Sequence, residues 1–236
     1  MKVTLTIDGQ IIHVEQHTPI LDAAKKLGIF IPTLCYHEAL KPFGACRLCM
    51  VEVIQNKRSM LVTSCSYPAE NGLEVLTASE RVKRIRRMVV ELLLARCPNV
   101  PLIQDLAYET GIKRARFKKK DDLRCILCGL CVRACEEIVG VSAIGFVNRG
   151  TEREVNTPFG IDSDVCIGCG TCTYICPTGC IEMATRPGSP GYRSLNIGDL
   201  ALVPCPNNYQ CEACEIEHGF FREMKRVIED VRGKGA

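Results

Sequence analysis

Residues 125–135 read CILCGLCVRAC and residues 166–177 read CIGCGTCTYICP, so one arrangement of four cysteines occurs twice in this chain. Each run has the spacing C-x2-C-x2-C-x3-C. Short x2 loops can place three thiolates around one metal cluster, whereas the fourth cysteine lies past the loop and is directed to another cluster. The repeat therefore predicts two neighbouring four-sulfur sites, each completed by the last cysteine of the other run.

This spacing is the one found in bacterial ferredoxins that hold two [4Fe–4S] clusters. Gly129, Gly168 and Gly170 suit a backbone that adopts positive φ and brings its N–H groups close to sulfide. A pair of zinc sites is the alternative, but zinc ribbons rarely carry this run twice. The predicted ligands of one cluster are Cys125, Cys128, Cys131 and Cys176, and those of the other are Cys166, Cys169, Cys172 and Cys135.

A third cysteine set precedes the repeat, with the pattern Cys35-x10-Cys46-x2-Cys49-x15-Cys65. Plant-type ferredoxins bind a [2Fe–2S] cluster through C-x4-C-x2-C and a distant cysteine, so the first loop is longer here while the CxxC core is kept. We therefore expect one [2Fe–2S] cluster on these four residues, with zinc as the alternative.

The sequence around this set predicts a β-grasp domain over residues 1–78. Apolar residues alternate with polar ones on both sides of a turn at Asp8-Gly9, and a helical pattern between Pro19 and Gly28 follows. The expected elements are strands over 3–7, 11–14, 48–54 and 60–63 and a helix over 20–27.

The remaining chain divides into a connector, a second ferredoxin domain and a tail, which gives an α+β fold class. The connector, 79–120, holds a strong amphipathic helix over 79–96, a weaker one over 102–110 and six basic residues in the run 113–120 that form a linker or docking loop. The two-cluster ferredoxin domain is expected over 121–186. The tail, 187–236, is expected to be irregular until a helix over 215–231.

Composition narrows the functional class. The chain has 17 cysteines in 236 residues, an odd number that favours metal over disulfides. Its 30 basic and 27 acidic residues are too evenly balanced to suggest a protein that binds nucleic acid. The start lacks the apolar segment of a secretion signal, and the stretch 88–95 is too short to span a membrane, so we expect a cytoplasmic protein without a membrane span.

The tail cysteines predict a further metal site. Cys205, Cys211 and Cys214 lie in PCPNNYQCEACE, where a CxxC pair offers two ligands and a third lies close by. We expect Cys97 as the fourth ligand of an additional [4Fe–4S] cluster, with Cys180 or His218 as alternative ligands. Zinc or an absence of metal are the alternatives to a cluster.

The order of these domains over about residues 1–185 resembles the N-terminal part of the large peripheral iron–sulfur subunit of respiratory complex I. It is similar also to the diaphorase iron–sulfur subunit of NAD-linked hydrogenases and formate dehydrogenases, and to the electron-input region of iron-only hydrogenases. The resemblance implies a row of clusters that transfers electrons beside a flavin subunit that uses NAD(H). The family usually adds an H-x3-C-x2-C-x5-C site, whereas residues 91–111 here contain only Cys97 and no His.

No motif supplies substrate chemistry, since the sequence has no G-x-G-x-x-G after a strand and no P-loop. We predict an electron-transfer subunit of a multi-subunit NAD(H)-linked oxidoreductase, electron-bifurcating enzymes included. Its expected partners are a flavin/NADH-binding subunit, a catalytic subunit of hydrogenase, formate dehydrogenase or tungsten/molybdenum type, and soluble ferredoxin. The alternatives are a free soluble polyferredoxin and a small reductase that uses a cluster at the C-terminal cysteines.

Overall fold

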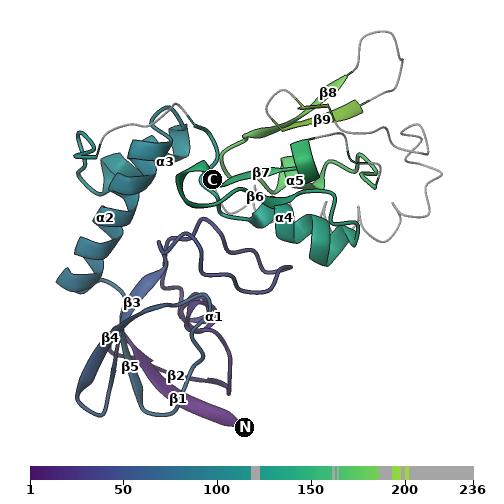
Figure 1. The fold of residues 1–236 in the computed structure, drawn as a ribbon. Helices are drawn as coiled ribbons and strands as arrows, with labels where there is room; N and C mark the ends of the chain where they lie inside the picture. The colour runs from purple at the N-terminus through teal and green to yellow at the C-terminus, as the bar shows by residue number, and fades with distance from the viewer. Residues whose placement is uncertain (118–122, 161–162, 164, 186–192, 198–199, 202–236) are drawn as a thin grey trace.

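The computed structural model describes residues 1–117, 123–160, 163, 165–185, 193–197 and 200–201. Figure 1 shows an N-terminal unit built on a sheet, two connector helices that rise from it, and a second unit of short elements beside them. A long loop of the N-terminal unit extends beneath the second unit. No helix among the described residues is long and apolar enough to cross a bilayer.

The N-terminal unit contains five strands: β1 (Lys2–Ile7), β2 (Gln10–Glu15), β3 (Met50–Gln55), β4 (Arg58–Thr63) and β5 (Leu73–Leu76). They form one sheet in the order β2-β1-β5-β3-β4. The β1–β2 hairpin turns at Asp8-Gly9, as the sequence predicts. The sequence did not indicate β5, which lies at the centre of the sheet, parallel to β1 and antiparallel to β3.

The sheet packs against α1 (Ile20–Lys26), which confirms the mixed α and β character of this unit. Inward-facing residues of β1 alternate along the strand, and four apolar positions of α1 cover them. Each fully buried Leu or Ile side chain stabilises the fold by about 1.5–3 kcal/mol. The side chains of this core include Val3, Leu5, Ile7, Ile20, Leu21, Ala23 and Ala24.

The connector consists of α2 (Glu80–Arg96) and α3 (Pro101–Glu109), which pack against each other. α2 is the helix that the sequence predicts over 79–96. The helix ends at Arg96, and the N–H of the next residue, Cys97, donates to the carbonyl of Leu93 at 2.8 Å. Pro101 is the first residue of α3, a position to which proline is well suited.

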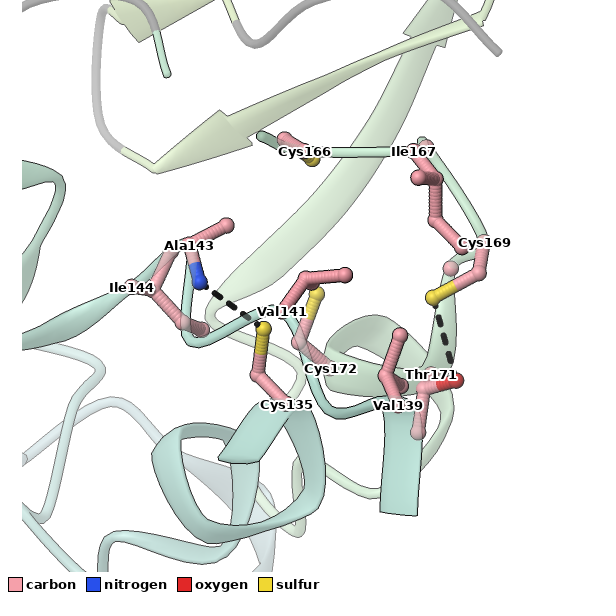
Figure 2. A pocket seen from close by; sticks show the side chains of 12 residues that line it. Cys135, Val139, Val141, Ala143, Ile144, Cys166, Ile167, Cys169, Thr171 and Cys172 are labelled. Atoms are coloured by element: carbon pink, nitrogen blue, oxygen red, sulfur yellow. Dashed lines mark hydrogen bonds between the residues drawn. The ribbon is translucent and has the colours of Figure 1, made fainter. Parts of the chain in front are cut away.

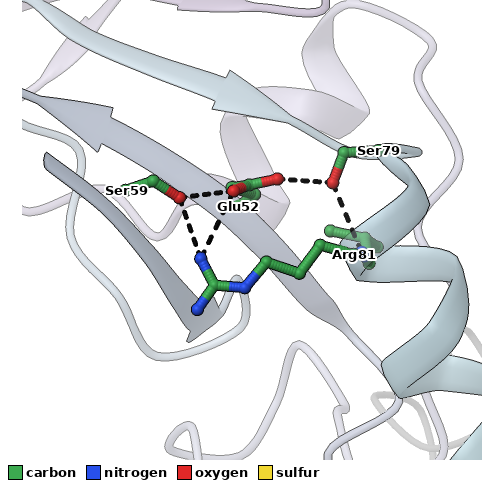
Figure 3. A network of polar contacts seen from close by, with 5 residues as sticks. Glu52, Ser59, Ser79 and Arg81 are labelled. Carbon is green, nitrogen blue, oxygen red and sulfur yellow. Dashed lines mark hydrogen bonds and ion pairs between the residues drawn. The ribbon is translucent and has the colours of Figure 1, made fainter. Parts of the chain in front are cut away.

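A polar network fastens the start of α2 to the sheet (Figure 3). Ser79 accepts a hydrogen bond from the N–H of Val82 at 3.3 Å and donates one to Glu52 Oε2 at 2.5 Å. Glu52, on β3, also accepts from Ser59 and from Arg81. These hydrogen bonds, that from Ser59 first, lower the pKa of the Glu52 carboxyl. The cap therefore orients α2 as well as satisfying its first turn.

The described part of the basic stretch 113–120, which we call the basic run, is anchored to α2. The Arg116 guanidinium donates to Glu91 Oε2 from Nη2 at 2.7 Å and to Oε1 from Nε at 2.8 Å. The Arg116 N–H also donates to Oε1, at 2.7 Å. Glu91 is 3 % exposed, so this ion pair ties the chain after α3 to the connector. Residues 118–120 of the run lie outside the described residues.

The C-terminal unit is built from short elements. They are α4 (Leu130–Arg133), a π-helical stretch Ala134–Val139, β6 (Gly145–Val147), β7 (Glu154–Asn156), α5 (Thr171–Tyr174), β8 (Ile181–Thr185), β9 (Arg193–Ile197) and β10 (Leu200–Ala201), with 3₁₀ turns at Gly150–Glu152 and Pro158–Gly160. β6 pairs with β7, and β9 pairs with both β8 and β10. The expectation of irregular chain from 187 onward was wrong at β9 and β10. The predicted helix over 215–231 lies outside the described residues.

Candidate metal centres

The loops between α1 and β3 and between β4 and β5 bring together the first four cysteines, Cys35, Cys46, Cys49 and Cys65, which we call the N-terminal site. Cys46 is partly exposed and the other three are buried. The Cys46 N–H donates to Cys35 Sγ at 3.3 Å. The four thiols act on one another electrostatically, which places them in a single group.

The sulfurs of the N-terminal site approach in two pairs. The Cys35 thiol donates to Cys46 and lowers the pKa of Cys46 to about 6, and the Cys65 thiol lowers the pKa of Cys49 to about 7 in the same way. The pKa values of Cys35 and Cys65 are raised, because each is the donor of its pair and is buried. Metal binding would displace the thiol protons, because cysteine binds a metal as the thiolate.

The second set, Cys125, Cys128, Cys131 and Cys176, is called the first cubane site. Cys125 Sγ accepts from the N–H of Leu127 at 3.4 Å, and Cys176 Sγ accepts from the N–H of Cys180 at 3.4 Å. Burial, helped by the charges of Cys125 and Cys176, raises the pKa values of Cys128 and Cys131. Mutual electrostatic effects of this kind arise only among neighbouring groups, so the last cysteine of the second run lies with the first three of the first run.

The third set, Cys135, Cys166, Cys169 and Cys172, lines one hollow (Figure 2). We call it the second cubane site. Apolar side chains, among them Val139 and Ile144, complete its wall. The N–H of Ala143 donates to Cys135 Sγ at 3.2 Å, and the Thr171 hydroxyl lies 3.3 Å from Cys169 Sγ. Burial raises the pKa values of Cys135, Cys166 and Cys172.

The donor sets of all three sites suit iron–sulfur clusters. Each offers four cysteine sulfurs, backbone N–H groups directed at some of those sulfurs, and an apolar surround, which are the features that hold and tune such clusters. The structure places Cys135 beside the cysteines of the second run and Cys176 beside those of the first, and the assignment of these residues as ligands stays a prediction.

Comparison with known proteins agrees with this geometry. Residues 1–80 match the family of 2Fe-2S iron-sulfur cluster binding domains, and residues 124–180 match the family of 4Fe-4S dicluster domains. The chain is 39 % identical to the alpha subunit of an NADPH-Fe(3+) oxidoreductase of Geobacter sulfurreducens, over 97 % of this chain and 29 % of that protein. It is 36 % identical to one subunit of an NADH-quinone oxidoreductase of Rhizobium meliloti, over 76 % of this chain and 24 % of that protein.

A solved structure extends the likeness to three dimensions. The crystal structure of an NAD+-reducing [NiFe]-hydrogenase in the H2-reduced state matches with a TM-score of 0.58 and 34 % identity, covering 66 % of this chain and 74 % of the matched chain. The chain belongs to the family of N-terminal iron–sulfur modules shared by NADH-quinone oxidoreductases and NAD+-reducing hydrogenase. The module spans less than a third of the length of the curated relatives it matches.

As a member of this family, the module carries one [2Fe–2S] cluster and two [4Fe–4S] clusters. The additional metal site predicted from the tail stays a prediction. Cys97 is fully buried, in the apolar core that includes Cys35 and Cys128. Cys205, Cys211 and Cys214, and the alternative ligand His218, lie outside the described residues. Within the described residues, no three His, Cys, Asp or Glu side chains are placed as ligands of a single metal ion.

The structure of the module also gives roles to residues that the sequence pattern left aside. Cys180, considered as an alternative ligand for the tail site, instead lies beside Cys125 and Cys176. Leu127 adopts a positive φ of 55°, at the position where the second run has Gly168 with φ 65°. Aligning the two runs residue by residue would have indicated this conformation for Leu127, because the backbone path around the sulfurs is repeated.

Proposed function

We propose that this module is the electron-transfer iron–sulfur part of a multi-subunit NAD(P)H-linked oxidoreductase. Bound iron–sulfur clusters supply one-electron chemistry, and the residues of this chain hold, insulate and tune them. We infer that the nicotinamide and flavin are bound outside this module, because its sequence carries no nucleotide-binding motif.

The contact between successive sites is the observation that carries this proposal. Cys35 of the N-terminal site and Cys128 of the first cubane site lie in one buried apolar core, and Cys46 packs against it. Cys131 of the first cubane site and Cys172 of the second lie in another. Three one-electron sites joined in a row by apolar protein suit a relay of electrons.

The names of the relatives support a nicotinamide-linked partner but differ over which nicotinamide it is. The relatives are named for NADPH, NADH and NAD+. The expectation of NAD(H) is therefore widened to NAD(P)H in this proposal. We further propose that the module relays electrons between a flavin-containing subunit and a catalytic subunit or soluble ferredoxin in the cytoplasm, and that bifurcating complexes are among those it would serve.

Anaerobic spectroscopy tests the proposal. The purified module should neither bind nor oxidise NADH or NADPH, and its cluster absorbance should bleach when a nicotinamide is added together with the flavin subunit. NAD(P)H oxidation by the module alone would contradict the proposal and favour a small reductase. A module that exchanges electrons rapidly with several unrelated enzymes but joins none of them in a complex would instead be a free polyferredoxin.

A further inference from the structure

Arg133 fastens the C-terminal unit to the N-terminal site. It lies in the first cysteine run, on α4, and is 7 % exposed. Its Nη2 donates to the carbonyl oxygen of Cys35 at 2.7 Å, and its Nη1 donates to the carbonyl oxygen of Lys41 at 2.5 Å. Its guanidinium carbon lies 5.0 Å from the centroid of the Phe43 ring. All three contacts are made to the loop that carries Cys35 and Cys46.

The internal repeat provides a comparison within the chain. Tyr174 occupies in the second run the position that Arg133 occupies in the first, two residues after the third cysteine. Tyr174 is 56 % exposed. A buried arginine is therefore not a requirement of the repeated fold. It is found in the copy that meets the N-terminal unit.

The charge of Arg133 has no carboxylate partner among the described residues. Its hydrogen bonds go to two carbonyl oxygens, and its buried Nε has no hydrogen-bond partner in the described part of the chain. Glu137, one turn further along, accepts from the N–H of Lys41. Burying a cation without a counter-ion is unfavourable, because the cation loses its hydration. A cluster bound through four thiolates carries a net negative charge, and it becomes more negative when it accepts an electron.

We propose that Arg133 is a fixed positive charge beside the N-terminal site, and that it raises the reduction potential of the [2Fe–2S] cluster while the two units are docked. The electron that reduces the cluster adds a negative charge, which the nearby guanidinium stabilises. Arg133 acts through the cluster's surroundings and ligates nothing, so it is a positioning and tuning residue. This inference rests on the cluster content of the proposed relay.

A redox titration of the whole chain with dithionite, followed by EPR, tests the inference. The [2Fe–2S] signal is read at temperatures where the signals of the cubanes have broadened. In Arg133→Gln, the ratio of reduced to oxidised [2Fe–2S] cluster at a fixed potential should fall on the order of tenfold, as expected for the loss of one nearby positive charge at a partly buried site. Arg133→Lys, which keeps the charge, should follow the wild type.

Arg153→Gln is the matched control, because Arg153 also stacks on a phenylalanine, 4.0 Å from the ring of Phe146, but is exposed. It should leave the titration unchanged. A wild-type potential in Arg133→Gln, or an equal fall in the lysine variant, would overturn the inference. If the glutamine variant does not fold, Arg133→Met takes its place, and a wild-type potential in that variant refutes the inference. Wild-type protein without clusters would refute the relay itself.

Discussion

The Sγ atoms of Cys176 and Cys180 lie 3.7 Å apart at the first cubane site. The Cys180 N–H donates to the same sulfur at 3.4 Å. The hydrogen bond between the Cys176 and Cys180 thiols is the main cause that lowers the pKa of Cys176 to about 5. The backbone N–H and the thiol of Cys180 therefore both lie against the sulfur of a predicted ligand.

Removal of the Cys180 thiol should lower the potential of the first cubane. Hydrogen bonds to a ligand sulfur stabilise the reduced cluster, which carries the extra negative charge. Cys180→Ala should therefore shift one of the two [4Fe–4S] signals to lower potential in an EPR-monitored titration, and Cys180→Ser should restore part of the difference. Both variants should keep the wild-type iron content.

Thr171 offers a matched control on the other cubane, because its hydroxyl lies 3.3 Å from Cys169 Sγ. Thr171→Val should shift the potential of the EPR signal from the second cubane site, which Cys180→Ala should leave unchanged. A shift of the same signal by both variants would contradict the division of these cysteines between two sites. Loss of iron in Cys180→Ala would show instead that Cys180 is itself a ligand.

Iron analysis checks the number of clusters. Protein purified without oxygen should contain about 10 Fe per chain from one [2Fe–2S] and two [4Fe–4S] clusters, or about 14 Fe if the tail holds another [4Fe–4S] cluster. Mössbauer spectra should assign this iron to cluster types. Zinc as the main metal would refute the cluster assignment of all the cysteine sets together.

The features that the sequence predicted are those with local signals. The cysteine repeat, the hairpin at Asp8-Gly9 and the helix from Glu80 to Arg96 each follow from spacing or periodicity over a short stretch. β5 was missed because it has four residues and is held by strands distant in sequence. The burial of Arg133 could not be predicted either, since its partners lie more than 90 residues away and depend on how the two units dock.

The ion pair of Glu91 with Arg116 should contribute to stability in a pH-dependent way. The hydrogen bonds from Arg116 lower the pKa of Glu91 from 4.5 to about 2. The unfolded chain therefore takes up this proton at a higher pH than the folded chain does. The contribution should be complete above pH 4.5 and should be lost as the pH falls toward 2. Urea unfolding at a series of pH values measures it.

Glu91→Gln should be less stable than the wild type at pH 7, and the difference should shrink on acidification. Lys83 and Glu80 provide a control, because they form an exposed ion pair on the same helix, and surface pairs of this kind contribute little. Glu80→Gln should change the unfolding free energy much less. An equal loss in the two glutamine variants would mean that the Arg116 contact does not anchor the basic run.

The remaining prediction concerns the tail. Similarity to the Geobacter relative covers 97 % of the chain, so the match extends into the region of Cys205, Cys211 and Cys214. Cys97, the proposed fourth ligand, is fully buried in the core that joins the N-terminal site to the first cubane site. A cluster on these four residues would therefore attach the tail to the junction of the two units. This junction is near the place where the family usually has a cluster with a His ligand.

Cys211→Ser should remove about four Fe and one EPR signal while the other clusters remain, because each thiolate is needed to complete its own cluster. Cys97→Ser should give the same result if the two residues share one site. Loss of the signal in Cys211→Ser alone would leave the tail site intact as a proposal but would remove Cys97 from it, and His218 would then be the next ligand to replace. Retention of all the iron in Cys211→Ser would refute the tail site, since a CxxC pair that has lost one sulfur cannot supply its two ligands.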